Sequence, residues 1–205
     1  MDLNYSTNLI FPVPIHQFDV NGFSEIQSDL IDYAYKLREK DPVGNKKSNE
    51  GGWQSFDFDI NNSDDILHNI LINCTNKFPV FKKNVYALVH AWVNINKTGD
   101  YNEKHLHPNC NLAGVLWIKA PKDCGNIVFD SPVQFQTNRE VNSYCDNFKK
   151  ENNIFNAYYF KPTEGRVLIF PSYLAHNVKK NLSQEDRISV SFNIRLQMAS
   201  QESHI

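Results

Sequence analysis

The sequence lacks a strong charge of either sign, a long apolar run and a leader-like N-terminus. Its 21 Lys and Arg residues are balanced by 23 Asp and Glu residues, so charge gives no reason to expect binding to nucleic acid or a membrane surface. No apolar run approaches the roughly 20 residues that cross a bilayer, and no basic region precedes an apolar one as in a secretory signal. These absences predict a soluble, cytoplasmic protein, and 205 residues favour a single domain with a sizeable core.

Cysteine is also scarce, and its four occurrences show no C-x-x-C spacing: Cys74, Cys110, Cys124 and Cys145. In a reducing compartment this pattern predicts free thiols rather than disulfides. Cys110 follows closely after two histidines, but we interpret it as a small, partly buried residue rather than as a ligand.

Two helical patterns occupy the N-terminal 84 residues. The first is expected over residues 25–39, after an N-cap at Ser24, because its apolar residues recur at three- and four-residue steps. The second is expected after an N-cap at Ser63 and ends before Pro79. The polar, glycine-rich segment 44–52 lies between them and is a candidate cover for a pocket.

From Val85 the apolar period changes from helical to two, which indicates strands. In residues 85–95 one face carries small aliphatic residues, and the other is large, aromatic and partly polar, which suits the lining of a barrel mouth. Further strands are expected within 112–120, 125–131 and 157–160, and three more within 165–195. Many short strands with turns between them predict a sandwich or jelly-roll barrel with the helices packed outside.

Three histidines are candidate metal ligands. His105 and His107 are two residues apart, so on a strand their rings project from one face, and Pro108 places them at the strand end. His176 shares a face with apolar neighbours, so its imidazole needs a partner when buried. A metal shared by all three rings would provide that partner, whereas we interpret His16, His68, His90 and His204 as structural or surface residues.

The strand that begins at Arg187 alternates apolar residues with polar ones. A solvated polar face would explain this pattern. An inward-facing guanidinium with the Ser189 hydroxyl two residues later would instead form a binding site for a carboxylate.

Several motifs together carry a resemblance. H-x-H-P at 105–108 is followed by AGVLWIKAP, GNIVFDSP, EGRVLIFPSYLAHNV and RISVSFN. These motifs, in this order, resemble the 2-oxoglutarate/Fe(II)-dependent oxygenases, and within that superfamily the uncharacterised bacterial and phage branch with the H-x-H-P motif. The resemblance covers about residues 85–196.

The resemblance implies a mainly β double-stranded β-helix (jelly roll) over residues 85–196, in one domain of 1–205 whose residues 1–84 form an N-terminal extension. It implies Fe(II) and 2-oxoglutarate as cofactor and co-substrate, with His105 and His176 as metal ligands. Arg187 matches the arginine that pairs with the far carboxylate of 2-oxoglutarate, and Ser189 matches the serine of the R-x-S element. Asn94 and Trp117 fall on strands that line the co-substrate pocket in relatives.

One position departs from the usual pattern, because His107 stands where a carboxylate ligand is expected. Three imidazoles still leave three positions open on iron, and a dianionic co-substrate would balance the added positive charge. Asp100, Glu103 or Asp130 are alternative sources of a carboxylate.

The sequence thus favours an Fe(II)- and 2-oxoglutarate-dependent dioxygenase that hydroxylates a substrate and releases succinate and CO2. One alternative is a cupin-like metal-binding barrel without oxidative activity, and another is a three-histidine iron dioxygenase that does not use 2-oxoglutarate. The sequence does not identify the primary substrate, which is either a small molecule or a peptide. A homodimer is one option for the assembly of the protein. The polar insertion at 138–153 is a candidate lid over the substrate.

Overall fold

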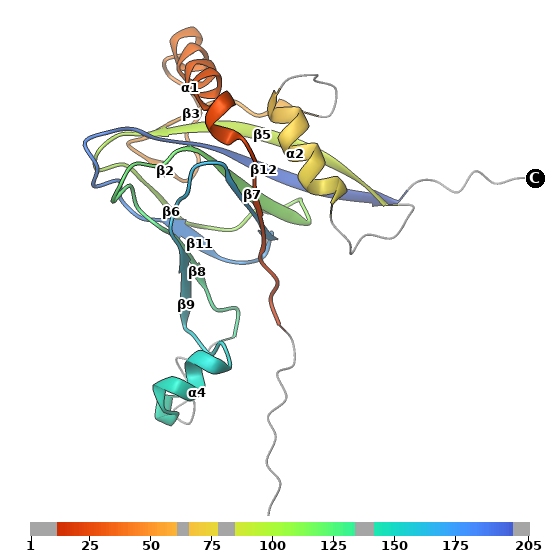
Figure 1. Cartoon of the computed structure of the whole chain (residues 1–205), viewed down its shortest axis with the longest axis vertical. Helices are drawn as coiled ribbons and strands as arrows, with labels where there is room; N and C mark the ends of the chain where they lie inside the picture. The colour runs from red at the N-terminus through yellow and green to blue at the C-terminus, as the bar shows by residue number, and fades with distance from the viewer. Residues whose placement is uncertain (1–11, 61–65, 78–84, 134–141, 199–205) are drawn as a thin grey trace, which may run out of the picture.

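The computed structural model describes residues 12–60, 66–77, 85–133 and 142–198. Within them two antiparallel sheets face each other, and two helices lie on the outside of the larger sheet (Figure 1). The helices are α1 (Phe23–Lys40), α2 (Ile66–Asn76) and the short α4 (Asp146–Glu151). This arrangement confirms the expected mainly β jelly roll with helices packed outside.

The larger sheet has seven strands in the order β1-β10-β7-β12-β5-β3, and β4 also pairs with β5. Its strands are β1 (His16–Asp19), β3 (Trp53–Gln54), β4 (Phe58–Asp59), β5 (Val85–Asn96), β7 (Leu112–Lys119), β10 (Arg166–Pro171) and β12 (Arg187–Met198). The smaller sheet runs β2-β6-β11-β8-β9. Its strands are β2 (Asn49–Glu50), β6 (Tyr101–His105), β8 (Ile127–Asp130), β9 (Ala157–Phe160) and β11 (His176–Val178).

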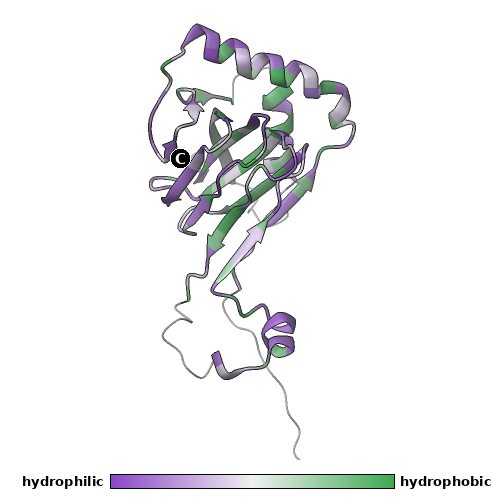
Figure 2. Cartoon of the chain, turned by 90° about the vertical axis from the view of Figure 1, so that its left-hand side faces the viewer, coloured by the Kyte–Doolittle hydropathy of each residue, from purple (hydrophilic) through white to green (hydrophobic). Residues whose placement is uncertain are grey.

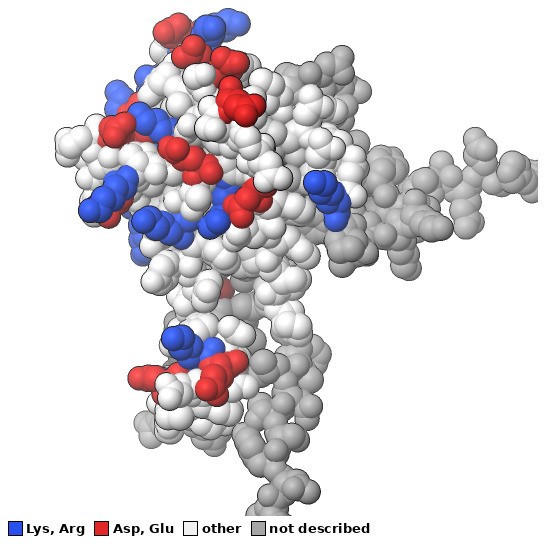
Figure 3. Space-filling view, viewed as in Figure 1, with Lys and Arg blue, Asp and Glu red and all other residues white. Residues whose placement is uncertain are grey.

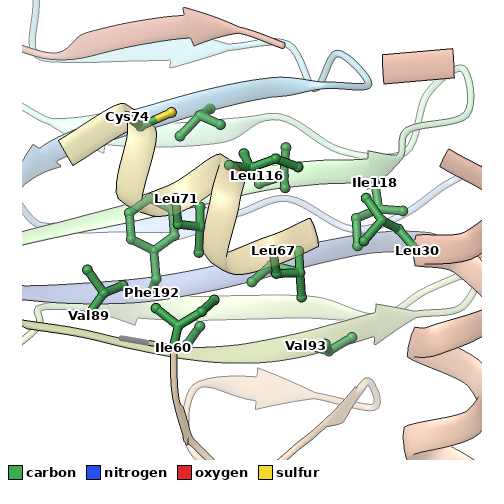
Figure 4. Close-up of a cluster of buried hydrophobic side chains, with 14 of the residues drawn as sticks. Leu30, Ile60, Leu67, Leu71, Cys74, Val89, Val93, Leu116, Ile118 and Phe192 are labelled. Atoms are coloured by element: carbon green, nitrogen blue, oxygen red, sulfur yellow. The ribbon is translucent and has the colours of Figure 1, made fainter. Parts of the chain in front are cut away.

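The main hydrophobic core lies between the larger sheet and the two long helices. Leu67 and Leu71 of α2 pack on the outer face of the sheet, against residues that include Val89 and Phe192 (Figure 4). All four side chains are at most 2% exposed. This layer holds β5 and β12 in place and leaves their other face for the space between the sheets.

The alternation in β5 and β12 has the predicted sidedness. Val93 and Ile95 of β5 belong to the outer core, as do Val190 and Phe192 of β12. Their neighbours in sequence face the inter-sheet space, where a second core cluster lies: Ala113, Val115, Trp117, Ile127, Phe129, Leu168, Phe170 and Leu174. Figure 2 shows the apolar residues concentrated in these strands, with mixed polarity along the helices.

One local expectation, the N-cap of the first helix, is wrong. Helix α1 begins at Phe23 after Gly22, whose φ of 68° is left-handed, so Ser24 lies inside the helix and is not its N-cap. Segment 44–52 contains β2, which pairs with β6, so part of it belongs to the smaller sheet. Ser63 and part of the insertion at 138–153 lie outside the described residues, and α4 lies within the described part of that insertion.

Across the described residues, none of the helices has the length and apolar character of a membrane span. The four cysteines are free thiols, as expected.

Candidate metal and co-substrate site

Three histidine rings converge between the sheets at one end of the barrel. His105 ends β6 and His176 begins β11, and these two residues are direct cross-strand partners. His107 lies beyond the end of β6, where its backbone N–H donates to the Ser172 carbonyl at 3.1 Å. One ring nitrogen from each residue lies within 4.8 Å of the others, an arrangement that could hold a metal ion.

Two backbone carbonyls fix which nitrogens face the centre. His105 Nδ1 lies 2.7 Å from the Glu103 carbonyl and His176 Nδ1 lies 2.9 Å from the Leu174 carbonyl. A carbonyl oxygen only accepts, so each Nδ1 carries the ring proton and each Nε2 is left with a free lone pair. His107 Nε2 lies 3.3 Å from His176 Nε2. Free lone pairs that converge in this way suit coordination of a cation.

Burial keeps these imidazoles neutral, which is the state that binds metal. Burial lowers the pKa of His105 below its usual value. It lowers the pKa of His107 to about 4 and that of His176 to about 3, with further lowering from the nearby His105. At neutral pH the three rings therefore present lone pairs rather than protons to the centre.

Aromatic residues from the larger sheet form a wall around the three rings. The Trp92 ring stacks on His107 with centroids 5.9 Å apart. Phe170 meets His176 edge-on at 4.8 Å. Trp92 and Phe170 are 7% and 2% exposed, so this wall limits the access of water to the rings.

Arg187 lies in the same cavity and is 1% exposed. Its Nη1 donates to three backbone carbonyls, those of Cys124, Gly125 and Lys179. Its Nη2 is buried and has no hydrogen-bond partner among the described residues. Burial lowers the pKa of Arg187 to about 10, so the guanidinium stays charged at neutral pH, and its unpaired N–H groups suit an anionic acceptor.

A glycine allows the carbonyls to gather around Arg187. Gly125 has φ of 90°, and a Cβ at this position would lie 2.2 Å from the Lys179 carbonyl oxygen. Only glycine adopts this conformation without strain and lets two backbone segments approach so closely. The GNIVF segment therefore helps to build the arginine end of the cavity.

The cavity between the sheets has a volume of about 50 Å³. It brings together all the residues expected from the sequence, and its lining includes His105, His107, His176, Arg187, Ser189, Asn94 and Trp117. The structure thus places these residues around one space, with the histidines and the guanidinium both facing it.

The other candidate ligands do not join the three histidines. Among the described residues, the metal-compatible group contains no carboxylate and no thiol. Asp130 forms an ion pair with Lys104, and Asp100 accepts a hydrogen bond from the Lys97 backbone N–H. Glu103 reaches the site through its backbone carbonyl, and the Cys110 thiol lies 3.4 Å from the His107 carbonyl.

Ser48 and Asn102 are among the lining residues that the sequence did not single out. Ser48, from segment 44–52, and Asn102, from β6, both face the cavity. The Ser48 carbonyl accepts from the Glu103 backbone N–H at 2.8 Å. The only sequence signal for Ser48 was the assignment of its segment as a pocket cover, and nothing in the period of β6 singled out Asn102.

Comparison with protein families shows which family the chain belongs to. A family model described as "Putative 2OG-Fe(II) oxygenase" matches residues 90–193, about half of the 205. The chain belongs to this family of 2-oxoglutarate/Fe(II)-dependent oxygenases. Membership implies Fe(II) and 2-oxoglutarate as cofactor and co-substrate, in agreement with the expectation from the motifs. A search of curated proteins found no significant match.

Solved structures show the same fold at low sequence identity. A prolyl-4-hydroxylase from Pseudomonas putida aligns with a TM-score of 0.61 and 12% identity, over 89% of this chain and 92% of its own. The carbocyclase SnoK from nogalamycin biosynthesis aligns with a TM-score of 0.61 and 9% identity, over 94% and 85%. A prolyl hydroxylase from Trichoplax adhaerens, in complex with a peptide fragment of hypoxia inducible factor, aligns at 0.59 and 12%, over 88% and 83%.

Proposed function

We propose that His105, His107 and His176 are the iron ligands of this oxygenase and that Arg187 binds the far carboxylate of 2-oxoglutarate. The single observation that carries the proposal is the unpartnered Nη2 of a buried arginine in the same cavity as three converging histidines. A buried cation with an unused donor is costly unless an anion binds to it. Ser189 adds a hydroxyl, and Asn94 and Trp117 line the pocket beside it.

The charges of the site fit a dianionic co-substrate. The histidines are neutral, so a divalent metal and Arg187 together would place three positive charges in the cavity, without a carboxylate ligand among the described residues. A dianion between them would remove most of this imbalance. A three-histidine dioxygenase that does not use a keto acid would share the metal site but would leave Arg187 Nη2 without an acceptor.

When bound, iron and 2-oxoglutarate would supply the oxidising chemistry with dioxygen as the oxidant: one oxygen atom enters succinate as the keto acid loses CO2, and the other enters the hydroxyl group formed from a substrate C–H bond. The protein contributes position and environment. Backbone carbonyls hold the rings of His105 and His176 and the Arg187 guanidinium in fixed orientations, and Trp92 and Phe170 keep water from the space between them.

The primary substrate is expected to present a narrow reacting group from a larger body. The cavity of about 50 Å³ also has to hold the metal and 2-oxoglutarate, so only a small part of the primary substrate could enter it. At the same end of the smaller sheet, Tyr158 on β9 is in register with Phe129 and, through it, with His176. Tyr158 is 49% exposed, and Tyr173, from the loop before His176, is 60% exposed. An elongated substrate, such as a peptide, could rest on these aromatic side chains.

An anaerobic titration tests the assignment. Fe(II) and 2-oxoglutarate added together should give a visible charge-transfer absorption band, and oxygen should then cause release of succinate. The Arg187→Met variant should bind Fe(II) but lose the effect of 2-oxoglutarate. If 2-oxoglutarate binds equally well to both proteins, the role given to Arg187 is wrong. If Fe(II) binds but 2-oxoglutarate has no effect even on the wild type, the three-histidine alternative is favoured.

A further inference from the structure

The three histidine rings are not held in the same way. His105 and His176 each donate from Nδ1 to a backbone carbonyl two residues earlier in the chain. The ring of His107 makes no such hydrogen bond to the backbone of the described residues, and its Nε2 lies 3.3 Å from His176 Nε2. Stacking on Trp92 sets the plane of the His107 ring, but it does not choose which nitrogen carries the proton.

Asn193 lies where its side chain can determine which ring nitrogen of His107 carries the proton. It lies on the inward-facing side of β12, two residues after Ser191 and four after Ser189, both of which line the cavity. Ser191 is the cross-strand partner of Trp92, on which His107 stacks, so the next inward residue of β12 lies beside that ring. The Asn193 side chain is close enough to the His107 ring to interact with it.

The Asn193 amide has an unused acceptor. Its Oδ1 is buried and has no partner of ordinary hydrogen-bond geometry among the described residues. A buried amide oxygen without a donor is unfavourable, by about 1–3 kcal/mol. The ring nitrogen of His107 that points away from the other two histidines is a donor that would satisfy it.

We propose that Asn193 is a positioning residue: its Oδ1 accepts the Nδ1–H of His107 and so directs the Nε2 lone pair of His107 toward the metal. The inference rests on the proposed function, since it concerns one of the three proposed ligands. The Asn193 amide would thus fix the tautomer of His107, as the Glu103 and Leu174 carbonyls do for His105 and His176. Partners of this kind fix the tautomer of a ligand and change metal affinity by about 10- to 100-fold.

Metal titration of two variants separates this role from simple packing. The affinity for Co(II), followed by its visible absorption, is measured in Asn193→Ala and Asn193→Asp. Asn193→Ala removes the acceptor and should weaken Co(II) binding about 10- to 100-fold. Asn193→Asp keeps an acceptor at the same place and should bind at least as tightly as wild type. The matched control is His90→Ala, because His90 is exposed and lies directly opposite Asn193 on β5.

A second measurement reads the geometry without mutation. In the Zn(II)-loaded wild type, the nitrogen NMR signals of His107 should show metal on Nε2 and a slowly exchanging proton on Nδ1. In the NMR experiment, metal on Nδ1 or a proton that exchanges as fast as in a free ring would overturn the inference. In the titrations, it would be overturned if Asn193→Ala bound Co(II) as tightly as wild type, or if Asn193→Asp weakened binding as much as Asn193→Ala. If the wild type binds neither metal, the proposed function fails and this inference falls with it; if it binds both and Asn193 has no effect, only the inference fails.

Discussion

The two ends of the cavity are prepared for their ligands in different ways. At one end the Arg187 guanidinium is charged, and its Nη1 is held by three backbone carbonyls. At the other end three neutral rings direct lone pairs toward one another, and His107 and His176 meet at 3.3 Å. At the arginine end the guanidinium is already held by backbone groups and Nη2 awaits an acceptor, whereas the histidine end needs a cation to relieve the repulsion between its lone pairs.

The largest expected effect comes from removing the charge at the arginine end. Arg187→Met should weaken 2-oxoglutarate binding by about 100-fold, because truncating one member of a buried charged pair costs about 2–5 kcal/mol. Metal affinity measured without 2-oxoglutarate should change much less. Isothermal titration with Mn(II), with and without the keto acid, measures both. An equal loss of metal and keto-acid binding would mean that the two ends are not independent.

Disturbing the backbone around the guanidinium should have the next largest effect. Gly125→Ala introduces a Cβ that overlaps the Lys179 carbonyl oxygen, so the carbonyls that hold Arg187 must move. We expect about tenfold weaker 2-oxoglutarate binding and a loss of about 1–3 kcal/mol in stability. Gly99→Ala is the matched control, since its φ of 92° is the same but no atom lies within 4 Å of the added Cβ. The control should lose stability in chemical denaturation but keep its co-substrate affinity.

Adding a negative charge at the histidine end should act in the opposite direction. His107→Asp supplies the carboxylate found in the usual iron site, so Mn(II) or Fe(II) should bind about tenfold more tightly in the absence of 2-oxoglutarate, a gain of ~1.4 kcal/mol. The increase in metal affinity caused by 2-oxoglutarate should become smaller, because less positive charge remains to be balanced. Paired titrations with and without the keto acid check this. An unchanged increase would show that charge at position 107 does not couple the two ligands.

The smallest expected effect concerns Ser189. Ser189→Ala removes one neutral hydroxyl beside Arg187, and a hydrogen bond of this kind contributes about 0.5–1.5 kcal/mol. The Kd for 2-oxoglutarate should therefore rise by only about two- to tenfold, without change in metal affinity. A loss as large as that of Arg187→Met would show that the hydroxyl, and not the guanidinium, dominates at this end.

The sequence predicted most where a local pattern determines the structure. The period of two separated the two faces of β5 and β12, and the order of the motifs gave the family and its cofactors. The roles of the individual residues remain proposals. The alternation in β12 also fitted a solvated polar face for Arg187, and its inward position was expected from the family resemblance; its neighbours Ile188 and Val190 are fully buried in the outer core.

The remainder depends on contacts between segments that are distant in the chain. The carbonyl of Lys179 meets Gly125 at the end of the pairing between β8 and β11, which lie about fifty residues apart in the chain, and no periodicity predicts that approach. Helix α1 begins earlier than Ser24 suggested, because Gly22 adopts a left-handed conformation and serves as the N-cap. A glycine can take this position without a side-chain cap. The position of Asn193 beside His107 likewise depends on how the loop after β6 folds back over Trp92.

Strands from the N-terminal segment are built into both sheets: β1 pairs with β10, β2 with β6, and β3 and β4 with β5. A fragment that starts at Val85 would retain every proposed ligand, yet it would carry unpaired backbone groups along three strand edges. Such edges recruit other chains, so trimming the protein to its family-matching half should yield aggregates in place of a minimal enzyme.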